Sequence, residues 1–208
     1  MPKTNSFKLL IFLLLACVLS LIFLDIPVAE FFKSHENKAF FRFSTEITEL
    51  GKSDIYIPLS LAVWLIFRKR NPLLAKIALS VFLTVVIAGL ASNITKFFFG
   101  RNRPVMLYDF DTYGFEFFHT KYYKTSFPSG HTTVAAALGS MLALHWRKLT
   151  IPAAAFIILM AVTRLSTLNH FLSDTLAGMI LGIGVSLLIY GRMFKDRKDA
   201  QISQCSPQ

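Results

Sequence analysis

Residues Leu73–Phe99 read LLAKIALSVFLTVVIAGLASNITKFFF, a run that holds two lysines and no acidic residue. A helix needs about 20 mostly apolar residues to cross the hydrocarbon core of a membrane. Hydrophobic residues make up 54% and charged residues 16% of the 208-residue chain. Other apolar runs that approach the spanning length are Phe7–Leu24, Ile55–Phe67, Phe127–Leu144, Ile151–Leu165 and Asp174–Tyr190. A soluble domain of this size would not carry so many, so the sequence predicts an all-α bundle of six transmembrane helices, one domain over residues 1–208.

Two of these runs leave a second interpretation open. Ile55–Phe67 is the shortest, and its helix could begin earlier, near Glu49. Phe7–Leu24 has Lys3 before it and Lys8 at its start, and it could be a signal peptide. Its apolar stretch exceeds the usual length of about 7–15 residues and no Ala-x-Ala-like cleavage site follows, so we expect a retained helix. Between the two runs, Ser34–Lys52 mixes phenylalanines with charges and predicts a short amphipathic helix at the membrane interface.

The net charge of the chain is +10, and its basic residues are concentrated in alternate connections between the apolar runs. Basic residues gather before the first run, between the second and third, between the fourth and fifth, and after the sixth. They are Lys3, Lys8, Arg68, Lys69, Arg70, Arg147, Lys148, Arg192, Lys195, Arg197 and Lys198. The other connections hold most of the acids: Glu30, Glu36, Glu46, Glu49, Asp54, Asp109, Asp111 and Glu116. The positive-inside rule then places both termini in the cytoplasm, and it explains the surplus without nucleic acid.

The fourth run opens with Phe127-Pro128-Ser129-Gly130-His131. Proline suits a first helical turn because it has no N–H to leave unpaired, so we expect the helix to begin at Pro128. Ser129 and Gly130 would then offer backbone N–H groups at a positive helix end, where anions bind, and Gly130 has no Cβ to block an oxyanion. An ordinary helix start with a hydrogen-bonded histidine has the same pattern. This motif alone therefore does not distinguish an anion-binding site from an ordinary helix start.

Three cations, Lys96, Arg103 and Arg164, lie at the ends of apolar runs. Lysine and arginine at helix ends often reach for lipid headgroups. These three, however, lie on the side where the positive-inside rule disfavours cations. Their presence there indicates that they bind a specific anion. Arginine offers a planar fork that matches phosphate, and lysine offers a point charge.

His170 and Asp174 are four residues apart and would share one face of a helix. A carboxylate there can accept the Nδ1–H of the histidine and leave Nε2 free to attack. The chain could still be turning at Leu172–Ser173, in which case the aspartate would cap a helix instead.

These residues, taken in order, resemble the three-part signature of the type 2 phosphatidic acid phosphatase superfamily, the lipid phosphate phosphatases. Lys96 is followed after six residues by Arg103-Pro104, then comes Pro128-Ser129-Gly130-His131, and then Arg164, five residues, His170, three residues and Asp174. The motif region covers residues 96–174, and vanadium haloperoxidases and bacterial acid phosphatases share the signature. One departure is Thr163, where the family usually has serine.

The resemblance implies a role for each site residue and a membrane-type bacterial phosphatase. His170 would be the nucleophile that forms a phosphohistidine, Asp174 would orient it, and His131 would protonate the leaving oxygen. The groups that would bind the phosphate are Lys96, Arg103, Arg164, Ser129 and the Gly130 N–H. No metal or other cofactor is expected, because three cations and a helix end can supply the charge that Mg²⁺ supplies elsewhere. The site would face the periplasm, with the chain in the inner membrane.

The segment Val105–Thr125 is rich in tyrosine and phenylalanine, which settle at the headgroup level of a bilayer. It could guide a lipid into the site, or it could anchor the protein without touching substrate.

Several functions are consistent with these features. The favoured one is hydrolysis of a membrane lipid phosphate or pyrophosphate, with undecaprenyl pyrophosphate, phosphatidylglycerol phosphate, phosphatidate and lipid A phosphates as candidate substrates. A lipid-to-lipid phosphotransferase would use the same site. A transporter would need ionisable groups throughout the membrane depth. A phospholipid-binding protein without activity would not need His131, His170 and Asp174 together. A haloperoxidase would be expected to be a soluble protein, unlike this apolar chain. Oligomeric state cannot be inferred.

Overall fold

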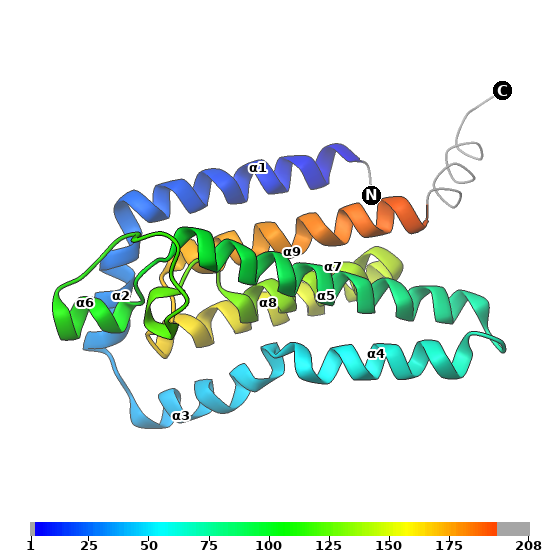
Figure 1. The fold of residues 1–208 in the computed structure, drawn as a ribbon, viewed down its shortest axis with the longest axis horizontal. Helices are drawn as coiled ribbons and strands as arrows, with labels where there is room; N and C mark the ends of the chain where they lie inside the picture. Colours follow the sequence, from blue (N-terminus) through cyan, green and yellow to red (C-terminus); the bar gives the residue numbers. More distant parts are fainter. Residues whose placement is uncertain (1–2, 195–208) are drawn as a thin grey trace.

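The computed structural model describes residues 3–194, and their fold is a bundle of helices (Figure 1). The elements in chain order are α1 (Lys3–Leu19), η1 (Ser20–Leu24), α2 (Asp25–Ser34), α3 (Lys38–Ile47), η2 (Thr48–Gly51), α4 (Ser53–Phe67), α5 (Pro72–Phe99), α6 (Pro104–Phe110), η3 (Tyr122–Lys124), α7 (Gly130–His145), η4 (Arg147–Leu149), α8 (Thr150–Ser166) and α9 (Leu172–Met193). Of the residues expected to form a basic C-terminal segment, Lys195, Arg197 and Lys198 lie outside the described range.

The predicted all-α transmembrane bundle is confirmed, with one difference in length. Among the described residues, five helical spans are long and apolar enough to cross a membrane: Asn5–Ser34, Lys38–Phe67, Pro72–Phe99, Arg147–Ser166 and Leu172–Met193. The remaining helix, α7, has only 16 residues. It packs against α5, α8 and α9, and most of its residues from 132 to 141 are buried. A helix shielded by its neighbours need not match the thickness of the lipid on its own.

Two expected boundaries were wrong, and one alternative start is confirmed. The helix of the fourth run begins at Gly130 and not at Pro128, because Ser129 is extended (φ −67°, ψ 113°) and acts as the N-cap residue. The earlier start considered for the second run is confirmed, since η2 joins α3 to α4 in an almost continuous span from Lys38. The expected amphipathic helix within Ser34–Lys52 is therefore the first part of this span. The first run continues through the π-helical turn η1 into α2.

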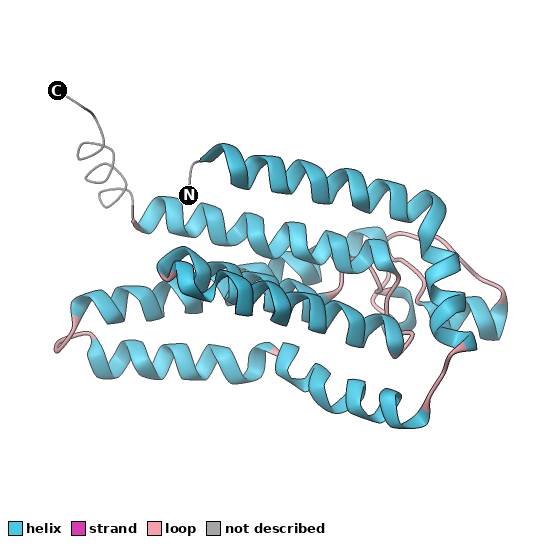
Figure 2. Ribbon diagram, turned by 180° about the vertical axis from the view of Figure 1, so that it is seen from behind, coloured by secondary structure: helices cyan, strands magenta, loops and turns pink. Residues whose placement is uncertain are grey.

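The connections divide between the two ends of the bundle. The start of α1, the turn between α4 and α5, the connection between α7 and α8, and the end of α9 lie together at one end (Figure 1). The segment between α5 and α7, which contains α6, lies at the other end with the start of α9 and the α1–α2 junction (Figures 1 and 2). The basic connections thus share one end, and the candidate site residues occupy the opposite one.

Helices α7 and α9 approach closely through two glycines. A Cβ on Gly178 would lie 2.7 Å from the carbonyl oxygen of Ser129, and a Cβ on Gly182 would lie 2.7 Å from the Cβ of Ala136. Glycines four residues apart let transmembrane backbones pack in contact. One turn further along, Ser186 Oγ donates to the carbonyl oxygen of Ala137 at 2.8 Å. This contact fixes the start of α7, with Ser129 and Gly130, against the start of α9.

We expect Gly182→Ala to destabilise the protein, because the added methyl group would overlap the backbone of α7. Overpacking of this kind costs about 1–3 kcal/mol. A lower thermal unfolding midpoint in detergent micelles would show the loss. The matched control is Gly184→Ala, since a Cβ there meets nothing within 4 Å. Alanine forms helix better than glycine, so the control should be neutral or stabilising. An equal loss in both variants would contradict close α7–α9 packing.

Candidate active site

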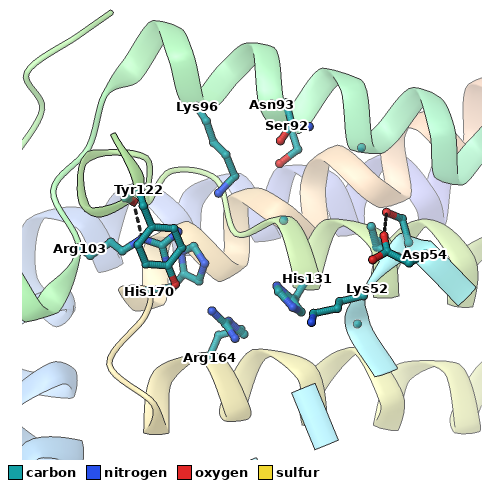
Figure 3. A pocket seen from close by; sticks show the side chains of 15 residues that line it. Lys52, Asp54, Ser92, Asn93, Lys96, Arg103, Tyr122, His131, Arg164 and His170 are labelled. Carbon is teal, nitrogen blue, oxygen red and sulfur yellow. Dashed lines mark hydrogen bonds between the residues drawn. The ribbon is translucent and has the colours of Figure 1, made fainter. Parts of the chain in front are cut away.

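A cavity of about 270 Å³ opens at the end of the bundle that carries the signature residues (Figure 3). Six of the eight predicted site residues line it: Lys96, Arg103, Gly130, His131, Arg164 and His170. They come from α5, the α5–α6 junction, α7, α8 and the α8–α9 loop. Asp174 lies behind His170, and Ser129 is fully buried without lining the cavity. The fold therefore brings together three sequence segments that span residues 96–174.

Lys96 and Arg103 are held by the segment that connects α6 to α7. Lys96 Nζ donates to the carbonyl oxygen of Thr125 at 2.9 Å. Arg103 Nε donates to the carbonyl oxygen of Tyr122 at 2.8 Å, and its guanidinium lies 3.8 Å from the centre of the Tyr122 ring. The same guanidinium donates to Asn169. These contacts use main-chain and amide oxygens, and within the described residues no carboxylate pairs with either cation.

Two polar atoms of the predicted site residues that line the cavity are buried and have no hydrogen-bond partner within the described residues. They are Nε2 of His131 and Nε of Arg164. A buried polar group without a partner is unfavourable by about 1–3 kcal/mol. Arg164 also donates from its NH1 group to Thr48 Oγ1 at 3.1 Å, which leaves part of the fork free. Both side chains are thus placed to bind a ligand that can accept or exchange hydrogen bonds.

Gly130 and Ser129 divide the roles that the sequence suggested for both. A Cβ on Gly130 would meet only side-chain atoms of Lys96 and Ser92, at 3.7 and 3.9 Å, so its backbone is open to the cavity. The N–H of Ser129 donates to the carbonyl oxygen of Asp174 at 2.9 Å, and its hydroxyl lies 3.1 Å from that of Thr132. Ser129 therefore joins α7 to α9, whereas Gly130 presents the helix end.

His170 precedes α9 and does not lie on it, so the two residues share no helix face and the alternative expectation, in which Asp174 caps the helix, is confirmed. Asp174 instead caps the helix: its Oδ2 accepts from the N–H of Phe171 at 2.8 Å. Asp174 Oδ2 also accepts from Ser126 Oγ at 2.6 Å and lies 3.6 Å from His170 Nδ1. Ser126 Oγ is 3.3 Å from the same nitrogen. Because the hydroxyl proton goes to Asp174, Nδ1 must carry the proton in this contact, which leaves Nε2 unprotonated and free.

Behind Asp174 lies a buried ion cluster that the sequence interpretation missed. The fully buried guanidinium of Arg101 donates to Asp174 Oδ1 at 2.5 Å and to Asp25 Oδ2 at 2.6 Å. Ser173 completes the cluster, since its hydroxyl and N–H both donate to Asp25, at 2.5 and 2.8 Å. The sequence signal was Asp25, which directly follows the first apolar run, because an ionisable residue in a membrane helix is unfavourable without a partner.

The charges around His170 keep its ring neutral. Burial, followed by Arg103, Lys96 and Arg164, holds the pKa of His170 well below its ordinary value. Asp174 favours the protonated ring, but Arg101 already compensates that carboxylate. Burial lowers the pKa of Arg101, yet Asp174 and Asp25 outweigh this and raise it above the ordinary value, so the guanidinium stays charged.

The aromatic segment 105–125 takes part in both the site and its support. Tyr113 and Phe115 pack over the Arg101 guanidinium, with ring centres 5.5 and 5.0 Å from it. Tyr122 lines the cavity. Phe110 and Phe118 are exposed, at 67% and 64%. The segment also begins as a helix, α6, where the sequence suggested a loop. Across residues 3–194, no three His, Cys, Asp or Glu side chains come together as a metal site would need.

Comparison with known proteins agrees with this arrangement. The model of the PAP2 superfamily matches residues 77–198. A lipid A 1-phosphatase of Rhizobium johnstonii is 36% identical over 107 residues, covering 51% of this chain and 44% of that protein. A lipid A 1-phosphatase of Rhizobium etli is 35% identical over 114 residues, covering 53% and 49%. The chain thus matches less than half the length of either relative.

Two solved structures share the fold. A transmembrane PAP2 type phosphatidylglycerolphosphate phosphatase from Bacillus subtilis superimposes with a TM-score of 0.68 at 22% identity, covering 95% of this chain and 98% of that one. Aquifex aeolicus LpxE gives a TM-score of 0.57 at 19% identity, covering 80% and 94%. With the family match over more than half of its length and its apolar spans, the chain is an integral membrane protein of the PAP2 superfamily.

Proposed function

We propose that this protein is a phosphatase that hydrolyses the phosphate of a membrane lipid through a phosphohistidine on His170, without a metal ion. The observation that carries the proposal is the single cavity in which two histidines flank three cations (Figure 3). The cations supply the electrostatic stabilisation that phosphoryl transfer needs. A transport path would instead spread its ionisable groups through the depth of the bundle, and here they gather at one end.

In the first step, His170 Nε2 attacks the phosphorus while Lys96, Arg103, Arg164 and the Gly130 N–H hold the nonbridging oxygens. The bond from phosphorus to the ester oxygen breaks, and His131, which is protonated when the phosphate dianion is bound beside it, gives its proton to that oxygen. His170 becomes a positively charged phosphohistidine, whose Nδ1–H is stabilised through Ser126 and Asp174.

In the second step, water attacks the phosphohistidine and gives its proton to His131, which is now neutral. The bond between phosphorus and Nε2 breaks, and inorganic phosphate leaves. His170 returns to its neutral form and His131 to its protonated form. A lipid hydroxyl in place of water would make the same site a phosphotransferase.

For the membrane, we propose insertion in a bacterial inner membrane with the site facing the periplasm. The basic connections lie at the end of the bundle opposite the cavity (Figure 1), and the positive-inside rule assigns that end to the cytoplasm. Both termini would then be cytoplasmic. For the substrate, the similarity to proteins named lipid A 1-phosphatase supports a lipid A phosphate, and the B. subtilis structure supports phosphatidylglycerol phosphate as a second candidate.

The two histidine roles can be separated by the leaving group. We expect His131→Asn to lower kcat on a lipid phosphate by about 10²–10⁴-fold, the usual contribution of a general acid. On p-nitrophenyl phosphate, whose leaving group needs no proton, the loss should be much smaller. His170→Asn should abolish both activities. In wild type, quenching the reaction in alkali should trap labelled phosphate on a peptide that contains His170, with a chelator present throughout.

Three results would contradict this scheme. Equal losses in His131→Asn on both substrates would remove the general acid role. Activity retained by His170→Asn would remove the nucleophile. Inhibition by the chelator would remove the metal-free mechanism.

We expect His170 to titrate below the ordinary histidine pKa of about 6.5, because its ring is buried beside three cations. The measurement is an NMR titration of protein labelled at histidine 13Cε1, with the resonance assigned by its absence in His170→Asn. Below pH 6.5 the unfolded form then binds more protons at this group than the folded form does. The free energy of unfolding therefore decreases as the pH falls. A midpoint at or above 6.5 would contradict the neutral nucleophile.

Arg101 should act as a positioning residue for Asp174 and, through it, for His170. We expect Arg101→Lys, which cannot fork between Asp174 and Asp25, to lower kcat about 10–100-fold while KM changes less than about threefold. Steady-state kinetics would separate the two parameters. KM should hold because Arg101 is fully buried and does not line the cavity.

The matched control is Arg42→Lys, whose partner Glu46 sits on the same exposed face of α3. Surface pairs contribute little, so both kinetic parameters and the unfolding midpoint should stay at wild-type values. A rise in KM alone for Arg101→Lys would show that Arg101 acts on the ligand directly.

A further inference from the structure

The turn η2 (Thr48–Gly51), which joins α3 to α4, packs against α7 and α8. These two helices carry His131 and Arg164, and both side chains point into the cavity (Figure 3). The turn lies before residue 77, where the match to the PAP2 superfamily begins, and none of its residues belongs to the signature. Its contacts with the two site residues are therefore not accounted for by the signature.

Thr48 is a hydrogen-bond partner of Arg164. Its Oγ1 accepts from the NH1 group of Arg164 at 3.1 Å, and the two residues are only 5% and 6% exposed. A guanidinium donates from five N–H groups in one rigid plane, so one fixed contact restricts the direction in which the rest of the fork points. The Nε group of Arg164 has no partner among the described residues, so the contact with Thr48 leaves it available for a phosphate oxygen.

Gly51 lies against the ring of His131. A Cβ on Gly51 would lie 2.9 Å from Cβ and 3.0 Å from Cδ2 of His131. The φ of Gly51 is not in the left-handed region that favours glycine, so the backbone alone does not require this residue. The requirement is the absence of a side chain. Cδ2 is bonded to Nε2, the buried nitrogen that lacks a partner within residues 3–194, so a methyl group here would displace the edge of the ring that carries this nitrogen.

The turn is itself held on both sides. Tyr56 on α4 donates its hydroxyl to the carbonyl oxygen of Leu50 at 2.5 Å. One helical turn earlier, Ser166 Oγ donates to Ser44 Oγ at 2.9 Å, which fixes α3 on α8. A 3₁₀ stretch inside a longer helical span is uncommon and often has a functional reason. The turn thus has a fixed position, from which it constrains the two site residues that it touches.

We propose that η2 is a positioning element for the reaction, in which Thr48 directs Arg164 toward the phosphate and Gly51 leaves the space that His131 needs to reach the leaving oxygen. One turn thereby fixes the separation between a phosphate-binding cation and the proton donor. A misplacement of about 1 Å can lower a catalysed rate about 100-fold. This inference rests on the proposed phosphatase activity and adds two positioning residues outside the signature.

Gly51→Ala should lower kcat on a lipid phosphate about 10–100-fold, because the displaced ring protonates the leaving oxygen less well. On p-nitrophenyl phosphate, whose leaving group needs no proton, kcat should change less than about threefold. A loss of folded protein would lower both activities by the same factor, so the ratio between the substrates reports the position of the ring. The matched control is Gly184→Ala, where a Cβ meets nothing within 4 Å, and it should keep the wild-type ratio.

Thr48→Val keeps the size of the side chain and removes the hydroxyl. It should weaken the binding of inorganic phosphate, measured by calorimetry in detergent, about five- to tenfold, the effect of one hydrogen bond. It should also lower kcat/KM on both substrates by about the same factor. Thr48→Ser should restore wild-type binding. In an Arg164→Ala background, Thr48→Val should have no further effect on phosphate binding, because its influence passes through Arg164.

The matched control for Thr48 is Ser44→Ala, which breaks the neighbouring hydroxyl pair between α3 and α8 without touching a site residue. It should lower the unfolding midpoint as Thr48→Val does and keep wild-type phosphate binding. Unchanged phosphate binding in Thr48→Val, or an equal loss in Ser44→Ala, would overturn the role of Thr48. Equal losses on both substrates in Gly51→Ala would overturn the role of Gly51.

Phosphate binding needs no turnover, so it keeps this outcome separate from failure of the proposed function. If His170→Asn retains activity, the phosphohistidine proposal fails, whereas the effect of Thr48→Val on phosphate binding in that variant still decides the positioning role. If turnover depends on His170 and neither Thr48→Val nor Gly51→Ala has its expected effect, the positioning role alone fails.

Discussion

The site depends on one buried guanidinium. Arg101 joins the α1–α2 junction, through Asp25, to the start of α9, through Asp174. Burying one cation with two carboxylates is unfavourable unless the carboxylates receive further hydrogen bonds, and here Ser20, Ser173, Ser126 and the Phe171 N–H donate them. Several hydrogen bonds therefore fix the position of Asp174, and Asp174 in turn constrains the position of His170. An N-terminal helix that touches no substrate thus contributes to the position of the nucleophile.

A second constraint is the concentration of positive charge at the cavity. Lys96, Arg103 and Arg164 face one space without a carboxylate among the lining residues beside them, and they repel one another when no anion is bound. Tight packing of α7 on α9 through Gly178 and Gly182 opposes this repulsion by fixing the backbone around them. The result is a preorganised anion site, in which charge stabilisation needs little rearrangement as the reaction proceeds.

His131 lies between His170 and Lys52 in the cavity (Figure 3). The cations Lys96, Arg103 and Arg164 line the cavity, and so does Lys52, which is paired with Glu49. Gly51 packs directly against His131, because a Cβ there would lie 2.9 Å from the Cβ of His131. The turn before α4 therefore constrains the position of His131.

The sequence by itself determined the membrane bundle, the gathering of its basic connections at one end, and most of the residues around the cavity. It could do so because apolar run length, charge bias and motif spacing are local properties. It also suggested His170 and Asp174 as a pair, but on a shared helix face that does not exist. Tertiary structure alone decided that Ser126 and Arg101 hold Asp174, that Ser129 caps α7, and that Ser92 and Asn93 reach the same cavity. Arg101 lies 73 positions from Asp174 and 76 from Asp25 in the sequence, and no local pattern encodes which buried charges will meet once the helices pack.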